Sequence, residues 1–206
     1  ALHLLRNHHF RTWEGGRAIY YHYVDAHVLK ARALMRAGDW AQAIPLLQKA
    51  MEYPANLEVG KPLDDERNAM IYYYLGLAHR KMGQSAKANE CFRNSTEASN
   101  SRHWDDLLYY QAKSHEARGN RDRAAQLYCD LIERGERQLE AGSSRRGIGV
   151  EENTAGSDRS VSEAYYLMAL GNLGLNQEGE ARRLFEKALQ AHRSNLWAMV
   201  HAQPGV

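Results

Sequence analysis

The sequence predicts an all-α fold, in which antiparallel helix pairs stack into a right-handed superhelical solenoid. We expect about four repeats and a C-terminal capping helix. The main observation is that one spacing of turn, small and bulky residues occurs four times along the chain. Composition agrees, because 206 residues with 44% hydrophobic and 25% charged content can bury a sizeable core.

The repeats align on the residue that joins the first helix of each pair to the second. These turn positions are Gly38, Gly83, Gly119 and Asn176. Seven residues before each turn lies a small residue: Ala31, Gly76, Ala112 and Ala169. Five residues after it lies an alanine: Ala43, Ala88, Ala124 and Ala181. Nine residues after it lies a bulky residue: Leu47, Phe92, Tyr128 and Phe185.

This pattern has a direct physical meaning. Small residues at facing points let two helices approach closely, and the bulky residue fills the space between them. A single pair cannot bury its apolar face, so successive pairs stack. Glycine, and asparagine among the other residues, best tolerates the left-handed conformation that the turn requires.

These positions resemble the tetratricopeptide repeat, a helix-turn-helix unit of 34 residues. The resemblance covers roughly residues 24–190, with insertions. Two positions depart from the family pattern, which favours a large aromatic residue in place of His27 and leucine in place of Gln111. The resemblance implies a non-catalytic scaffold that binds other proteins.

Taken in order, residues 1–23 form an N-terminal segment and the start of a first long helix. That helix is expected to begin after Gly15–Gly16 and to run to Ala37. Residues 24–190 form the repeat array. Residues 191–206 form the capping helix and tail, with four large apolar side chains: Leu196, Trp197, Met199 and Val200.

Two stretches separate neighbouring repeats by more than one unit requires. The first is residues 53–65, where Pro54, Gly60 and Pro62 exclude a helix. The second is residues 140–160, which are rich in glycine and serine and therefore predict an irregular loop. We expect the next helix to begin at Ser160, because Ser160 and Glu163 match a capping box.

A narrower resemblance is carried by residues 7–16, by residues 53–62 and by the long connection before the fourth repeat. They are similar to the C-terminal tetratricopeptide region of large bacterial proteins that carry an N-terminal β-rich domain of unknown function. This resemblance implies that the chain is the end of a longer polypeptide related to carbohydrate use. No catalytic residues are implied for this region.

The residues themselves predict no catalytic site, no metal site and no cofactor. His22 and His27 lie five residues apart, which is not the spacing of one helix face, and Cys91 and Cys129 have no companion ligands at zinc spacing. A formal net charge of +2 does not by itself argue for or against a polyanion, but nucleic-acid binders more often have a basic face well beyond it, so we expect no nucleic-acid partner. The sequence shows no membrane span and no signal segment, which favours a cytoplasmic location.

The candidate binding site is the wall lined by the first helix of each pair. Counting back from the turns places tyrosines and cations there. The candidates are Arg32, Arg36, Tyr73, Arg80, Lys81, Tyr109, Lys113 and Tyr166. Tyrosine offers a flat apolar ring with a polar tip, and the cations suit carboxylates or backbone carbonyls. The competing interpretation is that these tyrosines only pack between repeats.

The predicted partner is therefore a protein or peptide bound along this concave wall. The alternative function is a structural or dimerising appendage of a larger carbohydrate-related bacterial protein, which contributes to a glycan site. In that case the partners are the upstream domains of the same polypeptide and a second copy of the chain as a homodimer. Accessible tyrosines favour the first function, and a wall filled by another segment favours the second.

Overall fold

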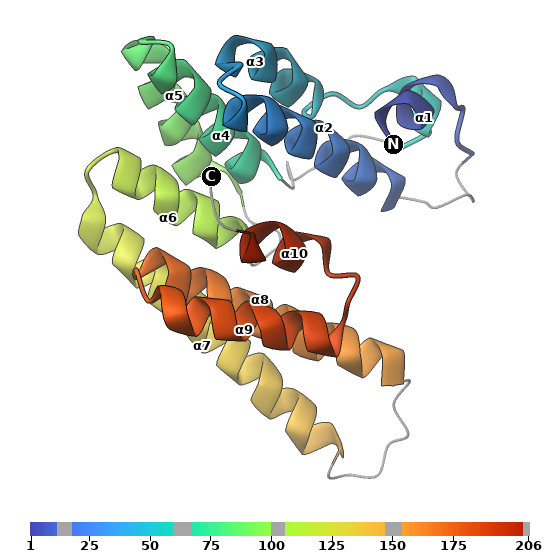
Figure 1. Cartoon of the computed structure of the whole chain (residues 1–206), viewed down its shortest axis with the longest axis vertical. Coiled ribbons are helices and arrows are strands. Elements are labelled where there is room, and N and C mark those ends of the chain that lie inside the picture. Colours follow the sequence, from blue (N-terminus) through green and yellow to red (C-terminus); the bar gives the residue numbers. More distant parts are fainter. Residues whose placement is uncertain (12–17, 60–66, 100–105, 147–153, 204–206) are drawn as a thin grey trace. The chain divides into compact units, whose positions relative to one another are not determined.

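A computed structural model describes most of the chain (Figure 1). The described residues are 1–11, 18–59, 67–99, 106–146 and 154–203. Within them all regular secondary structure is helical, which confirms the predicted all-α fold. The chain forms two compact units, Ala1–Leu107 and Leu108–Gly205. The expected single array over residues 24–190 stays a prediction, and Gly15–Gly16, Gly60 and Pro62 lie outside the described residues.

The N-terminal unit contains two antiparallel helix pairs preceded by a short helix. Its elements are α1 (Leu2–Asn7), α2 (Ala18–Arg36), α3 (Trp40–Lys49), a 3-10 turn η2 (Ala55–Leu57), α4 (Asn68–Lys81) and α5 (Ser85–Glu97). Helix α2 packs on α3, α4 packs on α5, and α3 also contacts α4. The first long helix is confirmed to within the usual uncertainty of helix ends.

The C-terminal unit contains α6 (Leu107–Ala117), α7 (Arg121–Arg146), α8 (Thr154–Gly174), α9 (Glu178–Ala191) and α10 (Leu196–Ala202). Helix α8 packs against both α7 and α9, and α10 packs against α9 (Figure 1). A helix is thus present where the sequence predicts the C-terminal cap. Its Asn195 N-cap side chain accepts a hydrogen bond from the backbone N–H of Ala198, which starts the helix.

All four predicted turns have the left-handed backbone that the repeat pattern requires. The φ angles are 88° at Gly38, 73° at Gly83, 86° at Gly119 and 60° at Asn176. Every small and bulky repeat position named above is buried. Burial of the small residues agrees with the close approach of paired helices that the spacing predicts, and at Gly76 a Cβ atom would meet the Phe92 ring of the paired helix.

The prediction of an irregular loop over residues 140–160 is wrong for the described residues at both ends of this stretch, which are helical. Helix α7 continues to Arg146 and α8 begins at Thr154, so Ser160 lies inside a helix and does not cap one. Gln138 of α7 explains part of this, because its Nε2 donates to the carbonyl oxygen of Ser160 at 2.9 Å and to its Oγ at 3.1 Å. Contacts between the two helices outweigh the turn-forming composition of this stretch.

Glycines allow α7 and α8 to approach closely. A Cβ atom at Gly135 would lie 2.5 Å from the carbonyl oxygen of Ala164, and one at Gly171 would lie 2.5 Å from that of Tyr128. A Cβ atom at Gly174 would meet the Tyr128 ring. The two backbones are therefore nearly in contact along this pair, and a larger residue would force them apart.

Among the described helices, none is both long enough and apolar enough to span a bilayer.

Candidate functional site

The first-helix face of the N-terminal unit, formed by α2 and α4, carries most of the predicted cations. Arg36, Arg80 and Lys81 are exposed, and Tyr73 is half-buried. On α4, Tyr73 lies seven residues before Arg80 and eight before Lys81, so the three share one side of the helix. The structure therefore keeps these four predicted residues at the surface.

Two of these cations also contact aromatic rings of their own unit. The guanidinium of Arg80 lies 4.4 Å from the centre of the Phe92 ring, and Nζ of Lys81 lies 5.8 Å from the Trp40 ring. Both distances allow a cation–π attraction, worth about 0.5–1 kcal/mol at exposed sites. The cations are thus held against the helix surface instead of extending freely into solvent.

Arg32 differs from the other predicted cations because it is only 5% exposed. Its guanidinium lies 5.5 Å from the centre of the Tyr74 ring, which joins α2 to α4. A second buried cation, Arg67, forms an ion pair with Asp25 of α2, with 3.2 Å between Nη1 and Oδ1. The interior of this unit therefore holds charged groups, of which Asp25 and Arg67 were not predicted from the sequence.

His27 is fully buried in α2, at the position where the repeat family favours a large aromatic ring. Its Nδ1–H donates to the carbonyl oxygen of Tyr23 at 2.8 Å, and Arg6 Nη2 donates to its Nε2 at 3.2 Å. Loss of solvation on burial lowers the pKa of this imidazole, and the nearby charges of Arg6 and Lys49 lower it further. The neutral form therefore fits the site, with Nδ1 protonated.

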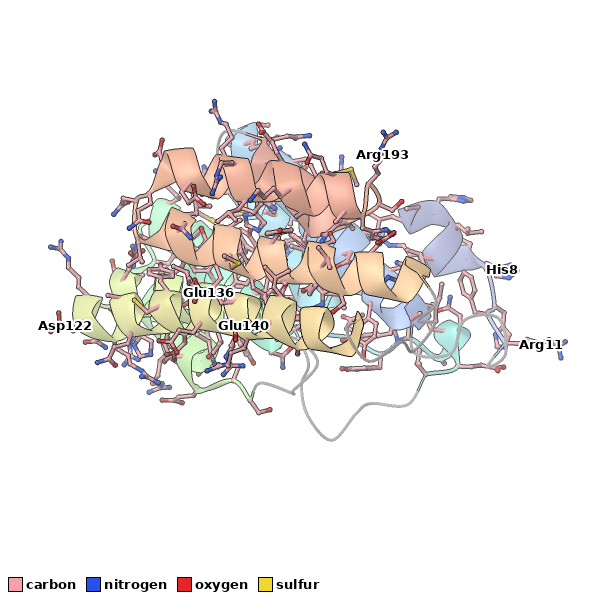
Figure 2. All side chains as sticks on the ribbon, turned by 90° about the horizontal axis from the view of Figure 1, so that it is seen from below. His8, Arg11, Asp122, Glu136, Glu140 and Arg193 are labelled. Atoms are coloured by element: carbon pink, nitrogen blue, oxygen red, sulfur yellow. The ribbon has the colours of Figure 1, made fainter. Side chains whose placement is uncertain are left out.

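The N-terminal segment and the first inter-repeat connection lie in contact with each other. Asn56 Nδ2 donates to the carbonyl oxygens of Leu5 at 3.0 Å and His8 at 2.8 Å, and the backbone carbonyl of Asn56 accepts from the Phe10 N–H at 2.7 Å. His9 Nε2 lies 2.7 Å from a carboxylate oxygen of Glu58. One amide side chain therefore fastens two sequence segments together. His8 and Arg11 are exposed there (Figure 2).

In the C-terminal unit the equivalent tyrosines are covered. Tyr109 of α6 is 8% exposed and Tyr166 of α8 is 1% exposed. The ring of His201 in α10 lies 5.6 Å from the Tyr109 ring and 6.0 Å from the Tyr166 ring. The same imidazole stacks on Phe185, with 6.1 Å between the ring centres and 11° between the ring planes. Its Nε2 is hydrogen-bonded to the hydroxyl of Tyr110 at 3.1 Å. We call these residues with Trp197 the His201 cluster.

The remaining predicted cation, Lys113, lies on α6 beside an acid. Its Nζ is 2.6 Å from Oε2 of Glu116, and both side chains are about one-third exposed. This pair reduces the net positive charge of the face. Of the predicted cations, the exposed ones therefore lie on the N-terminal unit, and the one in the C-terminal unit is paired with an acid.

An open hollow of about 500 Å³ lies at the turn end of the C-terminal unit. Glu116, Arg121 and Tyr128 contribute to its lining, together with Gly174 and Asn176. The opposite charges of Glu116 and Arg121 give it no strong preference for either sign of ligand.

Reactive groups are sparse in the part of the chain that the structure describes. There, no group of three His, Cys, Asp or Glu side chains is placed to hold a metal ion. Cys91 and Cys129 are free thiols. Burial raises the pKa of the Cys91 thiol, and the nearby carboxylate of Glu90 raises it further, so the thiol form is favoured over the nucleophilic thiolate.

His201 is the main site residue that the sequence reasoning missed. A signal was present, because Trp197 and His201 are four residues apart and fall on one face of a short helix. The target of that face could not be inferred, since Tyr109 and Tyr110 lie some ninety residues earlier in the chain. Counting from the turns still placed Tyr109 and Tyr166 on one shared face.

The comparison with family models agrees with the repeat spacing. Residues 71–97 and 106–134 match the model of the tetratricopeptide repeat. The chain therefore contains tetratricopeptide repeats at the second and third predicted positions. The first and fourth repeats lie outside the matched segments and are supported by the buried small residues and the left-handed turns at Gly38 and Asn176.

No curated protein matches the chain. Among solved structures, two crystal structures of MamA are each 19% identical to this chain, with a TM-score of 0.31. The two matches cover 82% and 89% of this chain, and 78% and 79% of the respective MamA chains. YrrB, described as a TPR protein with an unusual peptide-binding site, is 15% identical with a TM-score of 0.32 and covers 85% of this chain and 89% of its own. At such TM-scores the likeness carries no argument about function.

Proposed function

We propose that the protein is a non-catalytic interaction scaffold, and that the first-helix face of its N-terminal unit binds an acidic, extended segment of a partner protein. The observation that carries this proposal is that Arg36, Arg80 and Lys81 are exposed and the Tyr73 ring is half-buried on this face. The corresponding tyrosines of the C-terminal unit are buried under α10, so the N-terminal face is the more accessible of the two.

The chemistry of this face suits carboxylates. Arginine presents a planar fork that matches a carboxylate, and lysine adds a compact point charge. Contacts of Arg80 and Lys81 with the rings of Phe92 and Trp40 restrict the two side chains before a ligand arrives, which lowers the entropy lost on binding. Tyr73 adds an apolar surface on the same side of α4 as Arg80 and Lys81, so the favoured ligand combines acidic and apolar residues.

The expected affinity is modest and depends on salt. An exposed ion pair contributes roughly 0.2–1 kcal/mol, and ions at physiological strength screen such charges beyond about 8 Å. Three exposed cations therefore contribute more to the choice of partner, through its charge and register, than to the binding affinity.

Charge reversal tests this proposal directly. The probe is a fluorescent decapeptide that alternates glutamate and tyrosine, and binding is followed by anisotropy at low and high salt. We expect the double substitution Arg80→Glu and Lys81→Glu to weaken binding by about tenfold or more, since each lost contact also becomes a repulsion.

The matched control is Lys87→Glu with Arg93→Glu, which reverses two exposed charges on the second helix of the same pair. This control should change the affinity by less than a factor of about two, because surface charges away from the ligand are screened. Equal losses in the two double variants would reject the first-helix face as the binding surface.

The second candidate function is a structural or dimerising appendage of a larger carbohydrate-related protein. The contact of Asn56 with the N-terminal segment favours it, because that contact builds a rigid surface around exposed His8 and Arg11 against which another domain can pack. Sedimentation over a wide concentration range tests the dimer, and titration with soluble oligosaccharides tests the glycan site. A monomer at every concentration that binds no oligosaccharide would reject this candidate.

A further inference from the structure

Helix α10 contacts more of the C-terminal unit than a helix that only covers the end of a repeat stack. An end cap contacts the preceding helix, here α9, and α10 does so. His201, however, also contacts Tyr109 and Tyr110 of α6, which belong to the preceding repeat. Helix α10 therefore lies across the first-helix face of the C-terminal unit, where a bound segment of a partner would lie.

The contact of α10 is one-sided and short. Trp197 and Ala198 are buried and His201 contacts the tyrosines, whereas Met199 is 38% exposed. A helix of seven residues is not stable alone, so α10 is helical because it is docked. Docking depends on the His201 cluster. In addition, Nδ2 of Asn195, directly before α10, donates to Oγ of Ser162 at 3.0 Å.

The connection to the rest of the unit allows α10 to leave as a piece. Helix α9 ends at Ala191 and α10 begins at Leu196, so four residues join them. Arg193 in this connection is exposed and points into solvent (Figure 2). Release of α10 would break the His201 cluster, the Asn195 contact and the packing of α10 on α9, but none of the α7–α8 or α8–α9 packing. Local opening of such a segment requires much less free energy than unfolding of the unit.

We infer that the first-helix face of the C-terminal unit is a helix-binding site, and that α10 is its resident occupant, which a partner helix must displace. The partner is a short amphipathic helix with a large aromatic residue and, four residues later, a ring that can form a hydrogen bond. Its class follows from what the face already accepts, namely Trp197 and His201 on one side of α10.

Each part of this partner description corresponds to a contact of α10. The aromatic residue replaces the buried Trp197, and the second ring must stack on Phe185 and fit against the rings of Tyr109 and Tyr166. Its hydrogen-bonding atom must also meet the hydroxyl of Tyr110, because an apolar residue would leave that hydroxyl without this partner at a buried position. The inference concerns α6 and α8 and does not depend on the acidic segment proposed for the N-terminal unit.

The test supplies α10 as a separate peptide. A fluorescent peptide of residues 192–203 is titrated into three full-length proteins: the unaltered chain, the variant Trp197→Ala with His201→Ala, and the control Met199→Ala. The double variant loosens the resident helix and leaves the face intact. The apparent affinity of a covered site falls with the fraction of molecules that are open, so we expect the peptide to bind the double variant about tenfold tighter or more.

The control variant should bind the peptide like the unaltered chain, because Met199 lies on the exposed side of α10. A peptide with the same two alanine substitutions should not bind the double variant. Equal affinity for all three proteins, or binding of the substituted peptide, would overturn the inference.

A second measurement decides the question if the double variant does not fold, which circular dichroism will show. Hydrogen exchange of the unaltered chain should reveal faster exchange in α10 than in α8 and α9, as local opening requires. Protection of α10 equal to that of α8 and α9 would mean that it leaves only when the whole unit unfolds. That result would also overturn the inference.

Discussion

The two units carry the same repeat positions, but the exposure of their first-helix faces differs. In the N-terminal unit, Arg80, Lys81 and Tyr73 reach the surface, whereas in the C-terminal unit the equivalent tyrosines Tyr109 and Tyr166 are buried beneath α10. The repeat pattern is thus compatible with an open face and with a covered one. Whether such a face is available depends on the segment that follows the repeats and not on the repeats themselves.

The interiors differ as well. The N-terminal unit buries an ion pair and a neutral histidine, while α7 and α8 of the C-terminal unit approach through glycines until backbone meets backbone. Polar burial and close backbone packing are two ways to fix the orientation of neighbouring helices. They should respond differently to substitution.

The largest effect is expected for Asp25→Asn in the N-terminal unit. It removes the negative charge that faces buried Arg67, and breaking one side of a buried ion pair costs about 3 kcal/mol or more. Urea unfolding with hydrogen exchange as the local probe should show the loss in α2 and α4. Glu180→Gln breaks the exposed pair with Arg183 in the C-terminal unit and should change little. Similar losses in the two variants would contradict the buried pair.

Gly171→Ala should come next, with a loss of about 1–3 kcal/mol confined to the C-terminal unit. The added methyl group would meet the carbonyl oxygen of Tyr128, which is backbone and cannot turn aside. Gly76→Ala should cost less, since its methyl group meets only the Phe92 ring and alanine occupies this position in the other repeats. Thermal melts of both variants measure the difference.

Gly179→Ala is the matched control, because nothing lies within 4 Å of its added methyl group. Alanine is the better helix former by roughly 1 kcal/mol, so this variant should gain stability. A loss at Gly179 comparable to that at Gly171 would mean that the steric explanation is wrong.

The smallest effect is a pH dependence that the two units should show separately. Burial lowers the pKa of His27 in the N-terminal unit and of His115 in the C-terminal unit, where Arg118 and Arg123 also lower it. Below about pH 6.5 the unfolded chain binds a proton that the folded chain refuses, so stability falls as the pH drops from there towards the lowered pKa values.

The measurement is hydrogen exchange between pH 7 and pH 5.5, corrected for intrinsic rates and compared with the variants His27→Gln and His115→Gln. Each substitution should flatten the profile of its own unit only. A profile that either variant leaves unchanged would show that its imidazole is not the titrating group.

Local sequence was sufficient for the repeat geometry. The left-handed backbone at Gly38 and Asn176 and the burial of Ala43 and Phe185 follow from spacing alone, because each depends on neighbours within one helix pair. The same spacing brought Tyr73, Arg80 and Lys81 to one side of α4. These features needed no information from distant parts of the chain.

Features that depend on contacts between distant parts of the chain could not be predicted from the sequence. The stretch around Gly142 was expected to be a loop from its composition, yet α7 continues through it while Gln138 bonds Ser160 of α8. Ser160 matched a capping signal because the signal is short, and its side chain serves a contact between helices instead. His201 likewise acquires its role from tyrosines far away in the sequence.

The order of synthesis gives the covering helix a further consequence. The chain is made from its N-terminus, so α6, α8 and Phe185 emerge from the ribosome before His201 does. Until α10 follows them, the nascent chain presents an aromatic surface that the finished molecule conceals. Chaperones, or a partner made at the same time, would meet this surface before its own helix does.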